Sequence, residues 1–381
     1  MAERQYDVVV LGATGFTGAL TAQYLAAHAP DTTRWAIAGR NQSKLERLGL
    51  AVPLIHADVT DADSLKQLAE STNVLITTVG PYINYGEPVV AACAAAGTDY
   101  VDLTGEPEFV DQMWLRYNTQ AESSSARLVH SCGFDSIPYD LGVLFTVGQL
   151  PEGSPISISG YARTGATFSG GTYHSAIHVM SRLRQGAKVT RERSAKEQRP
   201  SGRRVRLVFG RPHRSQEAGG WAAPVPTIDP QHVLRSARAL DRYGPDFSYS
   251  HYMVTKRLTT LAGLGVGAGA VVTLAQLPPT RKALLKIKDP GEGPSEEQRA
   301  KSWFRVRFVA QSDGRRLVTE VSGGDPGYGE TSKMLAESAL CLAHDQLPER
   351  SGQLTTAVAM GQPLIDRLTR AGIEFRVVEA S

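Results

Sequence analysis

The chain has 381 residues, of which 41% are hydrophobic and 21% charged, and its formal net charge is +3. This length predicts two domains, and the composition excludes a chain that is disordered overall. The cysteines Cys93, Cys132 and Cys341 lie far apart without a CxxC pair. They therefore argue against a zinc site or a disulfide framework and favour a reducing, cytoplasmic setting. No signal-peptide pattern precedes the first predicted strand.

Positive charge is concentrated between residues 181 and 214, which include twelve Lys or Arg and only two Glu. Such a patch attracts anionic partners, among them phosphates, an acidic acyl carrier domain or anionic lipid headgroups. A solvated helix and hairpin would show the same pattern. We expect no nucleic-acid partner.

A glycine-rich turn joins the first predicted strand, Tyr6 to Leu11, to a helical pattern at Leu20 to Ala27. Gly12 permits a tight turn, Gly15 lets the backbone approach a pyrophosphate, and Gly18 lets the helix pack closely on the strand. The helix N-terminus then offers free N–H groups to the phosphates. The pattern predicts a Rossmann-type nucleotide site. Three further residues of this turn are expected to contact the cofactor: Thr14, Phe16 and Thr17.

The second predicted strand, Trp35 to Ala38, ends in Gly39 and Arg40. Enzymes that use NAD place an acidic residue near this point, where it binds the ribose 2′-hydroxyl. Arg40 is suited instead to a 2′-phosphate, because its guanidinium is permanently charged and forms two parallel hydrogen bonds. Asn41 and Lys44 follow in the same turn. The sequence therefore predicts NADP(H), although an exposed arginine in a loop remains the alternative.

Four further strands continue the alternation of strand and helix: Pro53 to Ala57, Asn73 to Val79, Thr98 to Leu103 and Arg127 to Ser131. Six strands at this spacing predict a complete doubly wound sheet. Ligands bind beyond the carboxyl ends of such strands. Asp58 is therefore expected near the adenine. Further cofactor contacts are expected from Thr78, Val79, Gly80, Pro81, Cys132 and Gly133.

Several segments resemble the saccharopine dehydrogenase-like oxidoreductases, and most of all the mycobacterial trans-acting enoyl reductases. They are GATGFTG, AGR, TTVGPY and CGFDSIPYDL, within residues 6–142, with later matches at 291–295 and 354–375. The resemblance implies NADPH and hydride transfer to a carbon–carbon double bond of a lipid or polyketide acyl chain on a carrier domain. Two alternatives stay open: a saccharopine-type dehydrogenase acting on an imine or secondary amine, and a non-catalytic nucleotide-binding protein associated with lipid.

The rhythm of strand and helix changes after residue 140, so residues 1–140 are predicted as the NADP-binding Rossmann domain. Residues 141–330 are predicted as an α+β domain on a mostly antiparallel sheet, with a substrate cleft between the domains. Residues 331–381 contain C-terminal helices and a strand that are candidates for packing back on the first domain. The predicted elements of the second half are Ile156 to Ala162, His174 to Leu183, Arg203 to Phe209, Trp303 to Ala310, Leu317 to Ser322, Thr331 to Leu342 and Val358 to Arg370.

Residues 258–280 contain no charged side chain and are bracketed by basic residues. The segment is long enough to span a bilayer, but four glycines and a Pro-Pro pair weaken that reading. Three readings follow: a membrane-embedded or membrane-attached helix, an apolar lid or tunnel wall for an acyl chain, and an ordinary buried helix. The first would place the protein in the cytoplasm, peripheral at the inner face of the membrane.

Enoyl reduction needs a hydrogen-bond donor to the thioester carbonyl and a proton source for the α-carbon. Tyr82, Tyr85, Asp135 and Thr172 are the candidates, because they follow strand ends or begin a helix. Structural roles are possible for each: Tyr82 can stack on the nicotinamide, and Asp135 can cap the following helix. His174 and His178 lack a third ligand, so no metal site is predicted.

Overall fold

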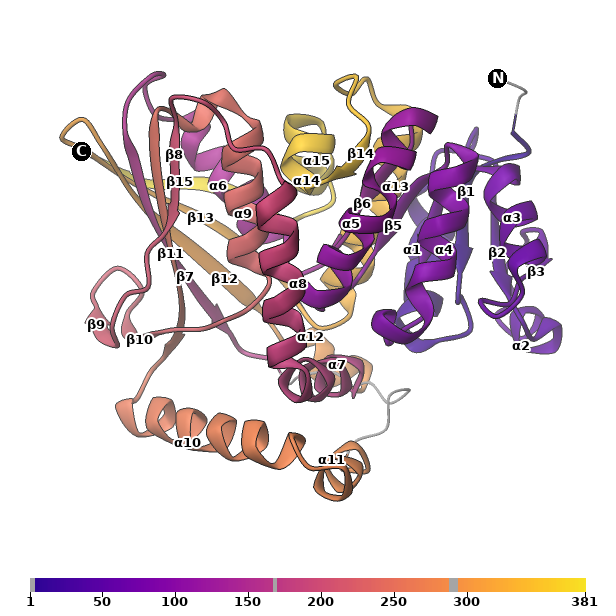
Figure 1. The fold of residues 1–381 in the computed structure, drawn as a ribbon, viewed down its shortest axis with the longest axis horizontal. Coiled ribbons are helices and arrows are strands. Elements are labelled where there is room, and N and C mark those ends of the chain that lie inside the picture. Colours follow the sequence, from indigo (N-terminus) through magenta and orange to yellow (C-terminus); the bar gives the residue numbers. More distant parts are fainter. Residues whose placement is uncertain (1–3, 167–169, 288–293) are drawn as a thin grey trace.

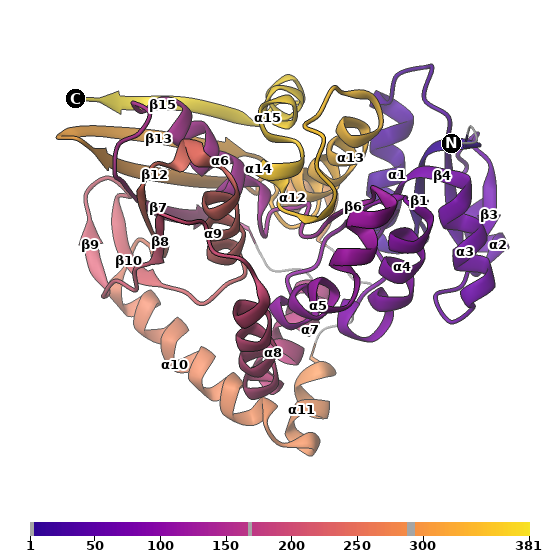
Figure 2. The same ribbon diagram turned by 45° about the horizontal axis from the view of Figure 1, so that its top comes forward.

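The computed structural model describes residues 4–166, 170–287 and 294–381, without the side chains of residues 170–172. Figure 1 and Figure 2 show two sheets beside each other, each flanked by helices. The first sheet is built mainly from the N-terminal third of the chain, and the second from the middle and the C-terminus. This arrangement confirms a Rossmann sheet accompanied by a second α+β unit.

The first sheet has seven strands in the order β14-β6-β5-β4-β1-β2-β3, and all neighbouring strands are parallel. Its strands are β1 (Tyr6–Leu11), β2 (Trp35–Gly39), β3 (Leu54–His56), β4 (Thr72–Thr77), β5 (Asp99–Asp102), β6 (Arg127–Val129) and β14 (Gly352–Leu354). The helices between them are α1 (Phe16–His28), α2 (Gln42–Glu46), α3 (Ala62–Ser71), α4 (Tyr82–Ala96) and α5 (Pro107–Ser124). The central strands are continuous apolar runs because helices cover both faces of a parallel sheet.

The second sheet has eight strands, seven of them in the order β15-β13-β12-β7-β11-β10-β9, while β8 pairs with β11. The strands are β7 (Ile156–Thr164), β8 (Arg204–Leu207), β9 (His213–Ser215), β10 (Gly220–Pro224), β11 (Asp246–Thr255), β12 (Phe304–Ser312), β13 (Arg315–Gly323) and β15 (Glu374–Ala380). Most pairs are antiparallel, but β11 runs parallel to β7 and to β8. In β12 alternate residues such as Val306 and Phe308 are buried, as expected for a sheet covered on one face.

In the second half of the chain, some predicted helices are divided into two shorter ones. The predicted helix at His174 to Leu183 is two helices, α7 (Gly170–Ser181) and α8 (Leu183–Lys196). The inward face of the second sheet is covered by α6 (Ile137–Gly148) and α9 (Asp229–Ala239). A short 3-10 turn, η1 (Asp241–Tyr243), precedes β11. Three further helices are α10 (Leu258–Ala275), α11 (Pro278–Leu285) and α12 (Glu296–Ala300).

The C-terminal region is shared between the two sheets. Helix α13 (Gly329–His344) packs on α1 and β4, and β14 pairs with β6. Strand β15 instead pairs with β13 of the second sheet. The predicted helix at Val358 to Arg370 is interrupted at Met360, between α14 (Thr356–Ala359) and α15 (Gly361–Arg370).

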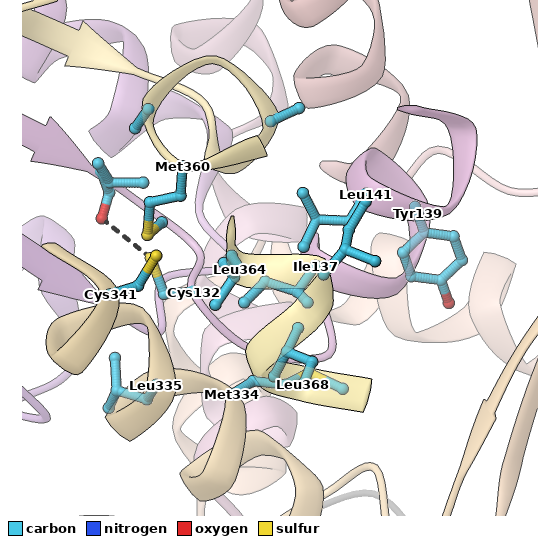
Figure 3. Packing of buried hydrophobic residues seen from close by; sticks show 14 of the residues in the cluster. Cys132, Ile137, Tyr139, Leu141, Met334, Leu335, Cys341, Met360, Leu364 and Leu368 are labelled. Carbon is cyan, nitrogen blue, oxygen red and sulfur yellow. Dashed lines mark hydrogen bonds between the residues drawn. The ribbon is translucent and has the colours of Figure 1, made fainter. Parts of the chain in front are cut away.

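One continuous hydrophobic core connects the two sheets. It contains Val10 and Ile37 of the first sheet together with Phe308 and Val321 of the second. Figure 3 shows the part of this core in which Cys132 and Cys341 lie among Met360, Leu364 and other apolar side chains. Because the core is shared, the two sheets are held in a fixed relation.

The apolar segment is exposed, which contradicts the expectation of an ordinary buried helix. Among the described residues, α10 is the one helix long and apolar enough to cross a membrane by length and composition, and only 6% of its window is buried. Figure 1 shows α10 at the foot of the molecule, below the second sheet. The predicted segment 258–280 also breaks at its Pro-Pro pair, where α11 begins.

Candidate active site

The glycine turn after β1 brings helix and strand into very close contact. Gly12 has a φ of +87°, a backbone conformation that residues other than glycine rarely adopt. A Cβ added at Gly18 would lie 2.3 Å from the carbonyl oxygen of Gly12, so only glycine fits there. The hydroxyl of Thr78 donates to the same oxygen at 3.1 Å. The turn is thereby fixed between the ends of β1 and β4.

The N-terminus of α1 is open to a ligand. Gly15 is its N-cap, and no side chain accepts a hydrogen bond from the first turn. Thr14 and Gly15 are exposed, while Phe16 and Thr17 are partly exposed. Uncapped N–H groups and the positive end of the helix dipole form a site for phosphate oxygens. The turn therefore fits a dinucleotide pyrophosphate.

Arg40 lies exposed at the carboxyl end of β2, beside the turn. Its charge contributes to lowering the pKa of Asp58, although hydrogen bonds from Thr60 are the larger cause. The Asn41 side chain caps α2 by accepting the Lys44 N–H at 2.9 Å. Arg40 and the exposed Lys44 thus supply two cations for a 2′-phosphate, while the amide oxygen of Asn41 is already engaged.

Tyr82 has a structural role that argues against the predicted catalytic one. Its side chain is only 6% exposed. The hydroxyl donates to the carbonyl of Thr77 at 3.1 Å and accepts the N–H of Leu103 at 3.2 Å. It therefore ties the end of β4 to the end of β5. Burial raises the pKa of this hydroxyl, which makes proton release still less favourable.

Glu106, which follows β5 at the carboxyl edge of the first sheet, is bonded to the start of α4 and to α7. The sequence analysis did not assign this role. Its carboxyl accepts the backbone N–H groups of Tyr82 and Ile83 at 3.1 and 2.9 Å, at the start of α4. The hydroxyl of Ser175 on α7 donates to it at 3.1 Å. Glu106 thereby fixes α7 against the loops that follow β4 and β5. Burial raises the pKa of Glu106, and these hydrogen bonds oppose that rise.

Asp135 follows β6 and lies where the two sheets meet. A Cβ added at Gly105, beyond β5, would be 2.9 Å from its Oδ2 atom. The neighbouring Phe134 ring packs edge-on against Phe304 of β12 and against Tyr139, with centroids 5.0 and 5.6 Å apart. The side chain remains partly exposed. Burial raises the pKa of Asp135 to about 6, so the carboxyl keeps a proton at much higher pH than an ordinary aspartate.

The other predicted residues lie in different surroundings. Tyr85 is 43% exposed on α4. Thr172 lies in the first turn of α7, and its side chain is outside the described part of the structure. Cys132 is fully buried, its thiol donates to the Val129 carbonyl, and burial raises its pKa. The predicted contact of Cys132 with the cofactor therefore does not involve its side chain.

Gly133 is packed against protein and is not open to a ligand. A Cβ there would lie 2.7 Å from Leu103 and 3.1 Å from Thr331. The segment that follows Val79 includes a cis peptide bond between Gly80 and Pro81. Gly80 is exposed and Pro81 is partly exposed at the carboxyl edge, so they remain predicted cofactor contacts.

Residues 8–129 match the family described as the saccharopine dehydrogenase NADP-binding domain. A Mycobacterium tuberculosis protein provisionally named a trans-acting enoyl reductase is 36% identical to this chain, over 98% of the chain and 97% of that protein. The chain belongs to the saccharopine dehydrogenase-like oxidoreductase family. A second relative, the trans-acting enoyl reductase of Mycobacterium ulcerans, is 35% identical over the same shares of the two chains.

The fold of this family is also seen in a solved structure. Apo saccharopine dehydrogenase from Saccharomyces cerevisiae matches with a TM-score of 0.58 at 13% identity, over 98% of this chain and all of that one. Together with the family match, these relatives make the chain an NADP-dependent oxidoreductase. The open α1 terminus and Arg40 fit that cofactor: they would hold its pyrophosphate and its 2′-phosphate.

Tyr328 and the first turn of α13 contact the glycine turn and the loop after β6, a role that the sequence analysis overlooked. Tyr328 packs edge-on against Phe16 with centroids 4.6 Å apart. Thr331 accepts the N–H of Phe134 at 3.2 Å, and Ser332 donates to the carbonyl of Thr17 at 3.4 Å. The available signal was the glycine-rich run at residues 323–329, between a strand and a helix. Among the described residues, no group of three or more His, Cys, Asp or Glu is placed to hold a metal ion.

Proposed function

We propose that this oxidoreductase is a trans-acting enoyl reductase, which saturates a carbon–carbon double bond in a lipid or polyketide acyl chain. The observation that carries the proposal is Asp135, a carboxyl with a raised pKa beside aromatic rings at the edge where the nicotinamide is expected. When bound, NADPH supplies the hydride for the β-carbon. The protonated Asp135 is the proposed proton source for the α-carbon.

The surroundings of Asp135 suit this role. Within the described part of the chain, its carboxyl has no hydrogen-bond or ion-pair partner, and burial alone accounts for its pKa. A carboxyl that forms no salt bridge retains its proton more readily. The partly exposed Phe134 ring beside it packs on the buried rings of Tyr139 and Phe304, so the carboxyl has apolar neighbours. Asp229 at the start of α9 is also buried, and the Asp135 charge contributes to raising its pKa.

Action in trans requires a surface for an acidic carrier domain, which we propose is the exposed side of α8. Fewer of the basic side chains at residues 181–214 are unpaired than the sequence suggests. Ion pairs with acidic side chains are formed by Arg182, Arg193, Arg203 and Arg206. Four cations on α8 stay exposed: Arg184, Lys188, Arg191 and Lys196. They would attract the carrier and deliver its acyl chain toward α7.

The reaction class is tested by following NADPH oxidation with two sets of substrates. One set contains α,β-unsaturated acyl thioesters of increasing chain length, free and attached to a carrier protein. The other contains an oxo acid together with an amine. We expect turnover with the thioesters only. Turnover only with the oxo acid and amine would make the protein an imine reductase, and NADPH binding without any turnover would support the non-catalytic alternative.

A further inference from the structure

Helix α10 presents apolar side chains to solvent along most of its length. Its 18 residues span about 27 Å. Among them, Val266 is 76% exposed, Leu258 49% and Leu264 48%. Four glycines, at positions 263, 265, 267 and 269, have nothing within 4 Å of an added Cβ. An exposed apolar surface of this extent in a folded protein marks a site of interaction.

Both ends of α10 are attached to the body of the protein. Strand β11 leads into its N-terminus after a two-residue connection. At the other end, Ala275 is buried with Ile177 of α7 and Leu284 of α11. The side chain of Gln276 donates to the Met180 carbonyl at 2.7 Å, and the Tyr173 hydroxyl donates to the Leu284 carbonyl at 3.1 Å. A helix fixed at both ends can lie in a membrane surface, but it cannot thread through a bilayer.

The charged residues within α10, α11 and their connections have a single sign. Residues 256–287, which we call the α10–α11 surface, include five basic side chains and no acidic one. The five are Lys256, Arg257, Arg281, Lys282 and Lys286. Basic residues at both ends of an apolar helix match anionic lipid headgroups around a hydrophobic interior. Helix-to-helix docking of a second copy would bring these like charges together, which opposes it.

The position of α10 also separates it from the cofactor site. Its main contacts are with α7, α11, β10 and β11. Figure 1 and Figure 2 both show it on the far side of α7 and α8 from β1 to β3. Its exposed side chains are therefore available while the cofactor edge remains accessible.

We propose that the α10–α11 surface seats the protein on an anionic lipid bilayer, with α10 lying in one leaflet and the basic residues at its ends contacting headgroups. The protein would then be attached to one face of the membrane without crossing it. This inference goes beyond the proposed reaction, because binding to lipid does not depend on turnover.

The test is flotation of the full-length protein with vesicles of phosphatidylcholine alone or mixed with phosphatidylglycerol. We expect the protein to float with the mixed vesicles and much less with the neutral ones, and added salt to weaken binding. The double variant Leu264→Asp, Val266→Asp should lower the bound fraction by at least about tenfold, since it places two charges in the hydrocarbon. These side chains face open space, so the fold should be retained.

The matched control is Val377→Asp, Val378→Asp on β15, at the opposite side of the molecule in Figure 1. Those two valines are 44% and 41% exposed, and their replacement should leave flotation unchanged. Three results would overturn the proposal: no flotation of the parent protein, equal flotation of the two double variants, or a self-associating parent that becomes monomeric on changing α10 without any lipid effect. NADPH binding, measured in parallel, reports separately on the cofactor site.

Discussion

The cofactor turn and the region around Asp135 are built from different chemical groups. On the first sheet, the cofactor side consists mainly of backbone: the Gly12 turn, the uncapped start of α1 and the exposed Gly80. After β6, by contrast, side chains meet from distant parts of the chain, among them the partly exposed Asp135, the buried Asp229 and the aromatic rings of β12 and α6. A backbone site can be recognised from local glycine spacing, whereas a side-chain site depends on how distant segments pack.

The largest expected effect concerns the backbone side. In Gly18→Ala, the new Cβ would lie 2.3 Å from the Gly12 carbonyl oxygen and force α1 away from β1. We expect NADPH binding to weaken by at least about 100-fold, measured by nucleotide fluorescence titration. Gly148→Ala is the control, because an added Cβ meets nothing within 4 Å there. Equal NADPH affinity in both variants would mean that the close contact is not required.

The next effect concerns Asp135, in the region built from side chains. Asp135→Asn should lower kcat for enoyl reduction by roughly 100- to 10,000-fold, because the proton source is lost. In the parent, kcat/KM should fall as pH rises through about 6, where the carboxyl loses its proton. The exposed Asp31→Asn serves as control. A parent profile that is flat through this pH window, or an active Asp135→Asn variant, would remove Asp135 from the mechanism.

The raised pKa of Asp135 also predicts how the free energy of unfolding depends on pH. Its pKa is raised in the folded protein above the ordinary value of 3.8, so the folded state binds the proton more tightly than the unfolded state. The resulting stabilisation is present below pH 3.8 and is lost as pH rises through about 6. Denaturant unfolding should therefore show Asp135→Asn gaining stability relative to the parent over this window. A constant difference between the two proteins would contradict the burial of the carboxyl.

A smaller effect is expected at Arg40. Arg40→Asp should weaken NADPH binding by about 10- to 1,000-fold and leave NADH binding much less changed, because only NADPH carries the 2′-phosphate. Arg47→Asp, also exposed and at the end of α2, is the matched control for charge. Unchanged discrimination between the two nucleotides in Arg40→Asp would show that another group binds the phosphate.

The smallest effect is expected at Tyr82, whose hydroxyl lies between the ends of β4 and β5. Tyr82→Phe removes the hydrogen bonds to Thr77 and Leu103, and should reduce the free energy of unfolding by about 1 to 2 kcal/mol. Its kcat should stay within about threefold of the parent, since the buried hydroxyl donates no proton to substrate. A hundredfold loss of kcat at unchanged stability would restore Tyr82 as a catalytic residue.

The sequence predicted the elements whose signals are local. Apolar runs that alternate with helical patterns identified the strands from β1 to β6, and the spacing of Gly12, Gly15 and Gly18 identified the turn. Strand β14 has only three residues, and the alternation of β11 from Asp246 to Ser250 stops at His251, so neither gives a long alternating signal. The roles of Glu106 and Thr331 were not predicted, because each arises from a contact between segments distant in sequence.

The pairing of β14 with β6, together with the packing of α13 on α1, has a consequence for synthesis of the protein. The glycine turn is synthesised hundreds of residues before Tyr328, Thr331 and Ser332, which pack around it. The nascent chain must therefore keep an unfinished sheet edge until residue 354 has emerged. The packing around the glycine turn is therefore completed only after α13 has been synthesised.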